Sequence, residues 1–167
     1  MLTLIGGGAR SGKSAESISR AQSHIRTNGR VLFIATAEPV DEEMKVRINN
    51  HKLQRTQEFD LVEEPTDLVS ALRKYPENEL AIVDCLTIWL SNLMMAEKLA
   101  PIEEVIDTAK SRKGSTIFVT NETGEGIVPM HPVSRKFRDL SGNMNQDFAR
   151  YCDEVIFMRF GLATRIK

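Results

Sequence analysis

The residues from Gly7 to Ser14 have the types and the spacing needed to hold a polyphosphate. They fit the pattern G-x-x-x-x-G-K-[S/T], in which glycines let backbone N–H groups turn inward around an anion. We expect Lys13 to reach the β- and γ-phosphates of a nucleotide and Ser14 to ligate Mg²⁺. The members of the predicted loop are Gly7, Gly8, Ala9, Arg10, Ser11, Gly12, Lys13 and Ser14.

The segments on either side of this loop favour a phosphate site over an ordinary Gly-Lys-Ser turn. Residues 2–6 begin with a short apolar run typical of a buried strand, and residues 13–27 have helix-forming composition with apolar side chains on one face. A helix N-terminus adds positive electrostatic potential to the loop's N–H groups. Strand, loop and helix together therefore predict a phosphate-binding loop.

A carboxylate at the end of another predicted strand is the second candidate for chemistry. Residues 80–84 are four apolar residues followed by Asp84, the pattern of a Walker B strand. Such a carboxylate can hold Mg²⁺ through water or accept a proton from a substrate. Many strands end in aspartate by chance, so Asp84 is a candidate site residue only because the chain also contains a phosphate loop.

His51 is the third candidate, on a predicted helix over 42–55. A lone histidine on a polar helix is usually a solvated surface group, but Arg47, Lys52 and Arg55 surround this one in the sequence. Neutral imidazole can attack phosphorus, and neighbouring cations favour the neutral form. These side chains would stand near the phosphate loop if strands 2–6 and 31–35 were neighbours.

The remaining elements predict one α/β domain over residues 1–167, with a mostly parallel sheet flanked by helices and right-handed crossovers. The polar loop 121–126 follows a strand, so it should face the same crevice as the phosphate loop. The apolar helix over 86–97, with Trp89, indicates core packing or a subunit contact. Further strands are expected at 31–35, 61–62, 115–120 and 154–158, and further helices at 65–74, 101–111 and 133–151.

Composition narrows the classes of function. The net charge is −1, which gives no basic field for nucleic acid, and no apolar run approaches the ~20 residues of a membrane span. A cleaved signal peptide would remove the first strand and the phosphate loop, so we expect a cytoplasmic protein. Its small size favours a small-molecule substrate. Cys85 and Cys152 lack metal or redox spacing and should be reduced, packed thiols. No Asn-Lys-x-Asp motif follows the later strands, which disfavours a Ras-like GTPase.

Several motifs together resemble one family, the bifunctional adenosylcobinamide kinase / adenosylcobinamide-phosphate guanylyltransferases of cobalamin biosynthesis. The resemblance covers essentially the whole chain. It includes Arg-Ile-x-x-His-Lys-x-x-Arg at 47–55 and Val-Asp-Cys-Leu-Thr at 83–87. The most specific strings are Thr-Asn-Glu-x-Gly-x-Gly-Ile-Val-Pro at 120–129 and Arg-x-Phe-Arg-Asp-x-x-Gly-x-x-Asn-Gln at 135–146.

This resemblance implies a RecA-like fold, a homotrimer and two reactions. ATP or GTP would phosphorylate adenosylcobinamide with Lys13 and Asp84 as catalytic residues. GTP would then transfer GMP to that phosphate through a guanylyl-His51 intermediate. Mg²⁺ would lie between Ser14 and Asp84. Nucleotide contacts carried over from the family are the phosphate loop together with Ala35, Thr36, Ala37, Lys52, Leu53, Gln54, Arg55, Glu63 and Asp84.

Two departures and two alternatives accompany this interpretation. The segment between Asn92 and Ile117 is short for the family, and the tail 161–167 matches it only loosely. One alternative is a small P-loop kinase for another metabolite, in which His51 is a surface residue. The other is a non-catalytic nucleotide-binding oligomer. Only the resembled family requires a covalent enzyme–nucleotide species.

Overall fold

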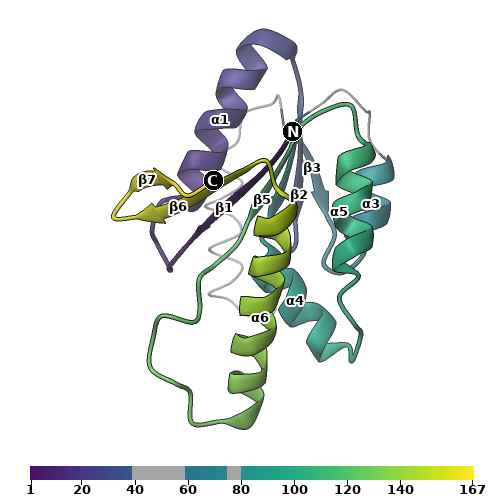
Figure 1. The fold of residues 1–167 in the computed structure, drawn as a ribbon. Coiled ribbons are helices and arrows are strands. Elements are labelled where there is room, and N and C mark those ends of the chain that lie inside the picture. The colour runs from purple at the N-terminus through teal and green to yellow at the C-terminus, as the bar shows by residue number, and fades with distance from the viewer. Residues whose placement is uncertain (39–58, 75–79) are drawn as a thin grey trace.

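The computed structural model describes residues 1–38, 59–74 and 80–167. A seven-stranded sheet in the order β3-β2-β4-β5-β1-β6-β7 forms its centre (Figure 1). All neighbouring strands are parallel except the antiparallel pair β6–β7, which confirms the predicted α/β fold with a mostly parallel sheet. The strands are β1 (Leu2–Gly7), β2 (Val31–Ala35), β3 (Phe59–Glu63), β4 (Leu80–Asp84), β5 (Thr116–Val119), β6 (Glu154–Arg159) and β7 (Leu162–Arg165).

Helices cover both faces of this sheet and bury two separate clusters of apolar side chains. Helix α1 packs Ile18 and Ala21 against one face, in a cluster with β-strand residues such as Phe33. The other face is covered by the remaining described helices, which Figure 1 shows across the sheet from α1. The helices are α1 (Lys13–Asn28), α3 (Leu68–Lys74), α4 (Leu86–Met95), α5 (Ile102–Ser111) and α6 (Pro132–Tyr151).

Strand β2 shows why the central strands are continuous apolar runs. Its Leu32 and Ile34 belong to the cluster on one face, and Val31 and Phe33 belong to the cluster on the other. A strand that is buried on both faces has no exposed position to fill with a polar residue. The apolar runs in the sequence therefore located the centre of the sheet correctly.

Helix α4 and the two cysteines belong to the core. Trp89 is fully buried, and its indole Nε1 donates a hydrogen bond to the backbone oxygen of Thr66 at 2.8 Å. Cys85 and Cys152 are buried free thiols, as predicted. Burial raises the pKa of each thiol to about 12.

Besides shifts of two or three residues at the ends of α3 and α4, the structure differs from the sequence-based expectations in three places. Strand β3 is longer than the predicted extended piece at 61–62, and strand β7 was not predicted. All four residues of β7 are exposed, so the strand lacks the apolar alternation that reveals a buried strand. Strands β1 and β2 are not neighbours, because β4 and β5 lie between them. The helix expected over 42–55 lies outside the described residues.

Candidate active site

The phosphate loop leaves β1 through a glycine that no other residue could replace without strain. Gly7 has φ +151°, and a Cβ atom at this position would lie 2.5 Å from the backbone oxygen of Met158 and 2.7 Å from Ser11 Oγ. Gly12, with φ +102°, then precedes the first turn of α1, where Glu16 N donates to Gly12 O at 3.0 Å. The loop thus ends at the N-terminus of a 16-residue helix, as an anion site requires.

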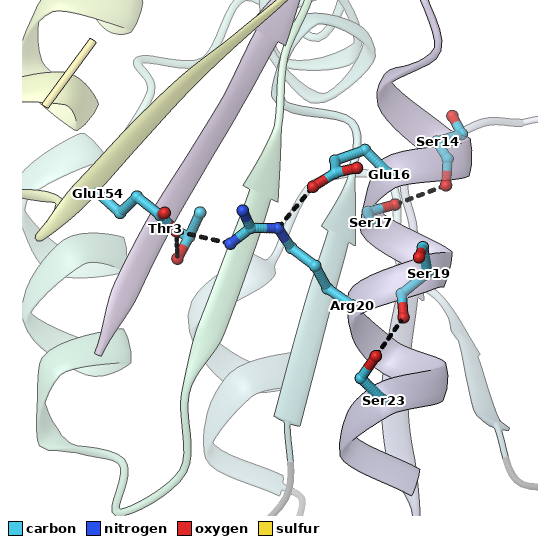
Figure 2. A network of polar contacts seen from close by, with 8 residues as sticks. All are labelled: Thr3, Ser14, Glu16, Ser17, Ser19, Arg20, Ser23 and Glu154. Carbon is cyan, nitrogen blue, oxygen red and sulfur yellow. Dashed lines mark hydrogen bonds and ion pairs between the residues drawn. The ribbon is translucent and has the colours of Figure 1, made fainter. Parts of the chain in front are cut away.

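Polar contacts brace α1 against the sheet behind the loop (Figure 2). Arg20 Nε donates to Glu16 Oε1 at 2.8 Å, and Arg20 Nη1 donates to Glu154 Oε2 of β6 at 2.6 Å. Thr3 of β1 donates to the same oxygen of Glu154 at 3.4 Å. Arg20 therefore links α1 to β6 through Glu154, and the same carboxylate contacts Thr3 of β1. These contacts help to orient the helix that carries the phosphate loop.

Lys13 lies inside the loop that is expected to hold the phosphates. Its side chain is buried, and Nζ donates to the backbone oxygen of Gly8 at 2.5 Å and to Ser11 Oγ at 3.3 Å. Burial lowers the pKa of Lys13 from its usual value, and the Asp84 carboxylate opposes that shift. The ammonium group is therefore positioned within the loop, with partners that a phosphate oxygen could replace.

Ser14 and Asp84 meet at the carboxyl edge of the sheet although strand β5 separates β4 from β1. Ser14 Oγ donates to Asp84 Oδ2 at 3.3 Å. No cluster of three histidine, cysteine, aspartate or glutamate side chains that could bind a metal occurs in the described ranges. A pair of hard oxygen ligands suits Mg²⁺, which keeps water and nucleotide phosphates in its shell and needs few protein ligands.

The register of the sheet places three predicted nucleotide contacts in one row. Ala35 is opposite Glu63 on one side and opposite Asp84 on the other. Thr36 and Ala37 follow directly after β2. The ends of β3, β2 and β4 therefore form a continuous edge beside Ser14. The roles of these residues in binding stay predictions.

Thr36 holds the end of β4 in place. It is fully buried, and its Oγ1 both accepts from Cys85 N and donates to Cys85 O, each at 2.8 Å. Its backbone N–H donates to Asp84 O at 3.1 Å. The Asp84–Cys85 peptide bond is cis. Because these polar groups all contact the segment that carries Asp84, Thr36 is placed to position that carboxylate.

Asn92 is a site residue for which the sequence suggested no role. Its Nδ2 donates to Thr36 O at 2.8 Å and to Pro65 O at 3.0 Å, so α4 ties together the segments that follow β2 and β3. An amide in a mostly apolar helix was the available signal. Its partners are 56 and 27 residues away in the sequence, however, and no local pattern reveals them.

Asn145 of α6 performs a similar task at the end of β5. It accepts from Thr120 Oγ1 at 2.7 Å through Oδ1 and donates to Asn121 O at 3.2 Å through Nδ2. Thr87 Oγ1 accepts from Asn121 N at 2.7 Å. These contacts fix the start of the polar loop 121–126. Some residues of the 120–129 and 135–146 motifs therefore have a structural role, which is to hold this loop in place.

The 121–126 loop lies against the phosphate loop, as expected from its place after a parallel strand. Glu122 N donates to Gly7 O at 3.0 Å, and Arg138 of α6 donates to Gly124 O at 2.5 Å. His51 and the predicted contacts Lys52, Leu53, Gln54 and Arg55 lie outside the described residues, as does Arg47. The described site therefore comprises the phosphate loop, the row at the strand ends and the residues that hold them.

Comparison with protein families identifies the group to which this arrangement belongs. The model of the family described as "Cobinamide kinase / cobinamide phosphate guanyltransferase" matches residues 3–166. The chain belongs to this family. The match includes the phosphate loop, Asp84 and the 120–129 and 135–146 motifs, and it confirms the resemblance drawn from the sequence.

Individual relatives agree over their whole lengths. A Pseudomonas aeruginosa protein named bifunctional adenosylcobalamin biosynthesis protein CobP is 38% identical, with 100% of this chain and 98% of the relative covered. An Escherichia coli protein named bifunctional adenosylcobalamin biosynthesis protein CobU is 32% identical, with 100% of both covered. The family is one of nucleotide-using transferases, which the phosphate loop of this chain fits.

A solved structure supports the fold alone. It is described as an ATPase domain, and it matches with a TM-score of 0.55 and 12% identity, over 93% of this chain and 68% of that one. This likeness confirms a P-loop NTPase architecture.

None of the helices in the described ranges is long and apolar enough to cross a membrane.

Proposed function

We propose that this protein phosphorylates adenosylcobinamide and then transfers GMP from GTP to adenosylcobinamide phosphate, giving adenosylcobinamide-GDP and pyrophosphate. The observation that carries the proposal is the contact between Ser14 and Asp84 beside the buried Lys13, in a chain that matches the family over residues 3–166. The contact unites a polyphosphate site with a carboxylate at the place where phosphoryl transfer needs both.

In the first reaction, the hydroxyl oxygen of the aminopropanol group attacks the γ-phosphorus, and the nucleoside diphosphate leaves with the bridging oxygen. The N–H groups of the phosphate loop and Lys13 stabilise the negative charge of the transferring group. Ser14 and Asp84 are the residues that would hold Mg²⁺, and the ion would supply charge neutralisation for the β- and γ-phosphates. Asp84 either holds this Mg²⁺ or orients the attacking hydroxyl and accepts its proton.

In the second reaction, His51 attacks the α-phosphorus of GTP and pyrophosphate leaves, so that GMP is held on the imidazole. An oxygen of the substrate phosphate then displaces the histidine and forms the new P–O–P bond. Arg47, Lys52 and Arg55 stabilise the attacked phosphate. Guanine-nucleotide contacts come from Ala35–Ala37, from Leu53 and Gln54 beside the basic residues, and from Glu63, of which the row at the strand ends supports Ala35 and Glu63.

Labelled GTP tests both steps at once. The protein is incubated with Mg²⁺ and GTP labelled at the α- or the γ-phosphate, and acid-labile label on the protein is measured. We expect α-label on wild type and none on His51→Ala, whereas Asp107→Asn, an exposed carboxylate on α5, should behave as wild type. Equal α-label on wild type and His51→Ala would contradict the guanylyl-histidine.

Supplying adenosylcobinamide tests the substrate. We expect γ-label to pass to the corrinoid and pyrophosphate to be released when GTP is present. Phosphoryl transfer to a different metabolite, with no pyrophosphate, would instead indicate a small P-loop kinase. Nucleotide binding with no turnover of any corrinoid would indicate a non-catalytic role.

A further inference from the structure

The turn between β6 and β7 carries a residue that its geometry does not favour. Arg159 is opposite Leu162, which leaves Phe160 and Gly161 as a two-residue loop. Both have positive φ, +55° and +78°, the pattern of a type I′ turn. Asparagine, aspartate and glycine adopt this conformation readily, but a bulky aromatic residue is an outlier there. Phe160 is therefore held in this conformation at a local cost.

The fold itself does not repay that cost. The Phe160 side chain is 92% exposed, so it removes almost no apolar surface from water. An asparagine would suit the turn better and would lose no core packing. A residue that breaks a local rule without a structural gain is expected at functional positions.

The turn is fixed directly beside the phosphate loop. Gly161 N donates to Ser11 O at 3.0 Å, and a Cβ atom built on Gly12 would lie 3.2 Å from Gly161 Cα. Arg159 Nη2 forms an ion pair with Glu125 Oε2 at 2.9 Å, which joins the turn to the 121–126 loop. The backbone of Phe160 is therefore held beside the phosphate loop, and its ring projects from this fixed turn.

The order of the strands indicates which part of a nucleotide faces this turn. Asp84, on the β4 side of β1, marks the end where the γ-phosphate reacts. In the kinase reaction, a nucleotide whose γ-phosphate reacts at Asp84 and whose β-phosphate lies in the loop extends its α-phosphate, ribose and base away from Asp84. The hairpin β6–β7 lies on that opposite side of β1.

We propose that Phe160 is a stacking platform for the purine base of the nucleoside triphosphate that donates its γ-phosphate. This inference rests on the proposed kinase reaction. The platform is separate from the guanine contacts expected at the ends of β2 and β3, because β4, β5 and β1 lie between those strands and the hairpin. One phosphate loop would thus be flanked by two base positions, one for each reaction.

Phe160→Asn is the decisive variant, because it removes the ring while installing a residue that type I′ turns prefer. Affinities for β,γ-imido ATP, β,γ-imido GTP and inorganic tripolyphosphate are measured by calorimetry with Mg²⁺, along with thermal stability. We expect unchanged or higher stability and unchanged tripolyphosphate affinity. The nucleotide analogue that wild type binds more tightly should bind about tenfold more weakly, the scale of one base–aromatic stack.

Two further variants separate stacking from general apolar loss. Phe160→Tyr keeps a ring and should retain wild-type affinity, and Leu162→Asn removes a neighbouring side chain that is 71% exposed and should also retain it. The inference is overturned if Phe160→Asn changes nucleotide affinity less than twofold. It is also overturned if tripolyphosphate weakens equally or if Leu162→Asn has the same effect. Wild type that binds neither nucleotides nor tripolyphosphate would overturn the proposed function as well.

Discussion

Gly7 has no room for a side chain, and this sets the shape of the phosphate loop. We predict that Gly7→Ala lowers the free energy of unfolding by about 1–3 kcal/mol, the usual cost of one strained backbone position. The methyl group would meet the backbone oxygen of Met158, which cannot turn aside. Urea unfolding measures the change.

Gly142 of α6 is the matched control, because a Cβ atom there meets nothing within 4 Å. Gly142→Ala should stabilise the protein by up to about 1 kcal/mol, since alanine is the better helix former. If both alanine variants shifted stability equally, the steric account of Gly7 would be wrong.

Asp84 is the carboxylate on which phosphoryl transfer is expected to depend. We predict that Asp84→Asn lowers kcat of the kinase reaction about 10²–10³-fold, as the loss of one preorganised electrostatic group does. Tripolyphosphate binding without Mg²⁺ should persist, because Lys13 and the loop remain. Asp107→Asn serves again as the control. Loss of less than fivefold would remove Asp84 from the chemistry.

At the scale of elements, the end of β4 depends on Thr36 at the end of β2. We predict that Thr36→Val destabilises the protein by about 2 kcal/mol, because it leaves buried backbone groups of Cys85 without their 2.8 Å partners. Thr36→Ser keeps the hydroxyl and should stay within about 1 kcal/mol of wild type. Denaturant unfolding and kinase activity of the two variants should fall in the same order.

The sequence was a good guide to elements and a poor one to their neighbours. The apolar runs at 31–35 and 80–84 located β2 and β4 because strands buried on both faces have no polar positions. Such runs do not reveal the order of the strands in the sheet. The sequence therefore left open whether β1 and β2 are neighbours, and in the structure β4 and β5 lie between them. Strand β7 was missed because its residues are all exposed and its support is an antiparallel partner.

The site divides in the same way. The phosphate loop and Asp84 were predicted because their function needs a local spacing. Asn92 and Asn145 were assigned no role, since their partners come from other elements that only the fold brings close. The sequence pattern thus identifies the residues expected to take part in the reaction, but not the residues whose hydrogen bonds hold them in place.

At the scale of the whole molecule, both thiols are locked in the core. We predict that Cys85 and Cys152 resist alkylation in the native protein at pH 8 and that both react after unfolding in urea, as mass spectrometry would show. Their pKa values are raised from 9.0 to about 12, so the folded state retains protons that the unfolded state loses. Stability should therefore fall as pH rises from about 9 towards 12. In the alkylation experiment, rapid labelling of the native protein would show that at least one of the two thiols is accessible.

Assembly belongs to the same scale and is proposed from family resemblance. We predict a homotrimer of 18.8 kDa chains, with a mass of about 56 kDa by light scattering. A monomeric mass with full activity would show that the site is complete within one chain.

We also propose a cytoplasmic location, which fractionation of cells expressing the protein can test.

The pairing of β1 sets the order in which the protein can become functional during its synthesis. Thr3 and Glu154, which contact each other across β1 and β6, are 151 residues apart in the sequence. The phosphate loop emerges early, yet its walls are Met158, Gly161 and the 121–126 loop. We therefore expect a growing chain to carry an open glycine loop, and expect the nucleotide site to be complete only when β5 and the hairpin β6–β7 have joined the sheet.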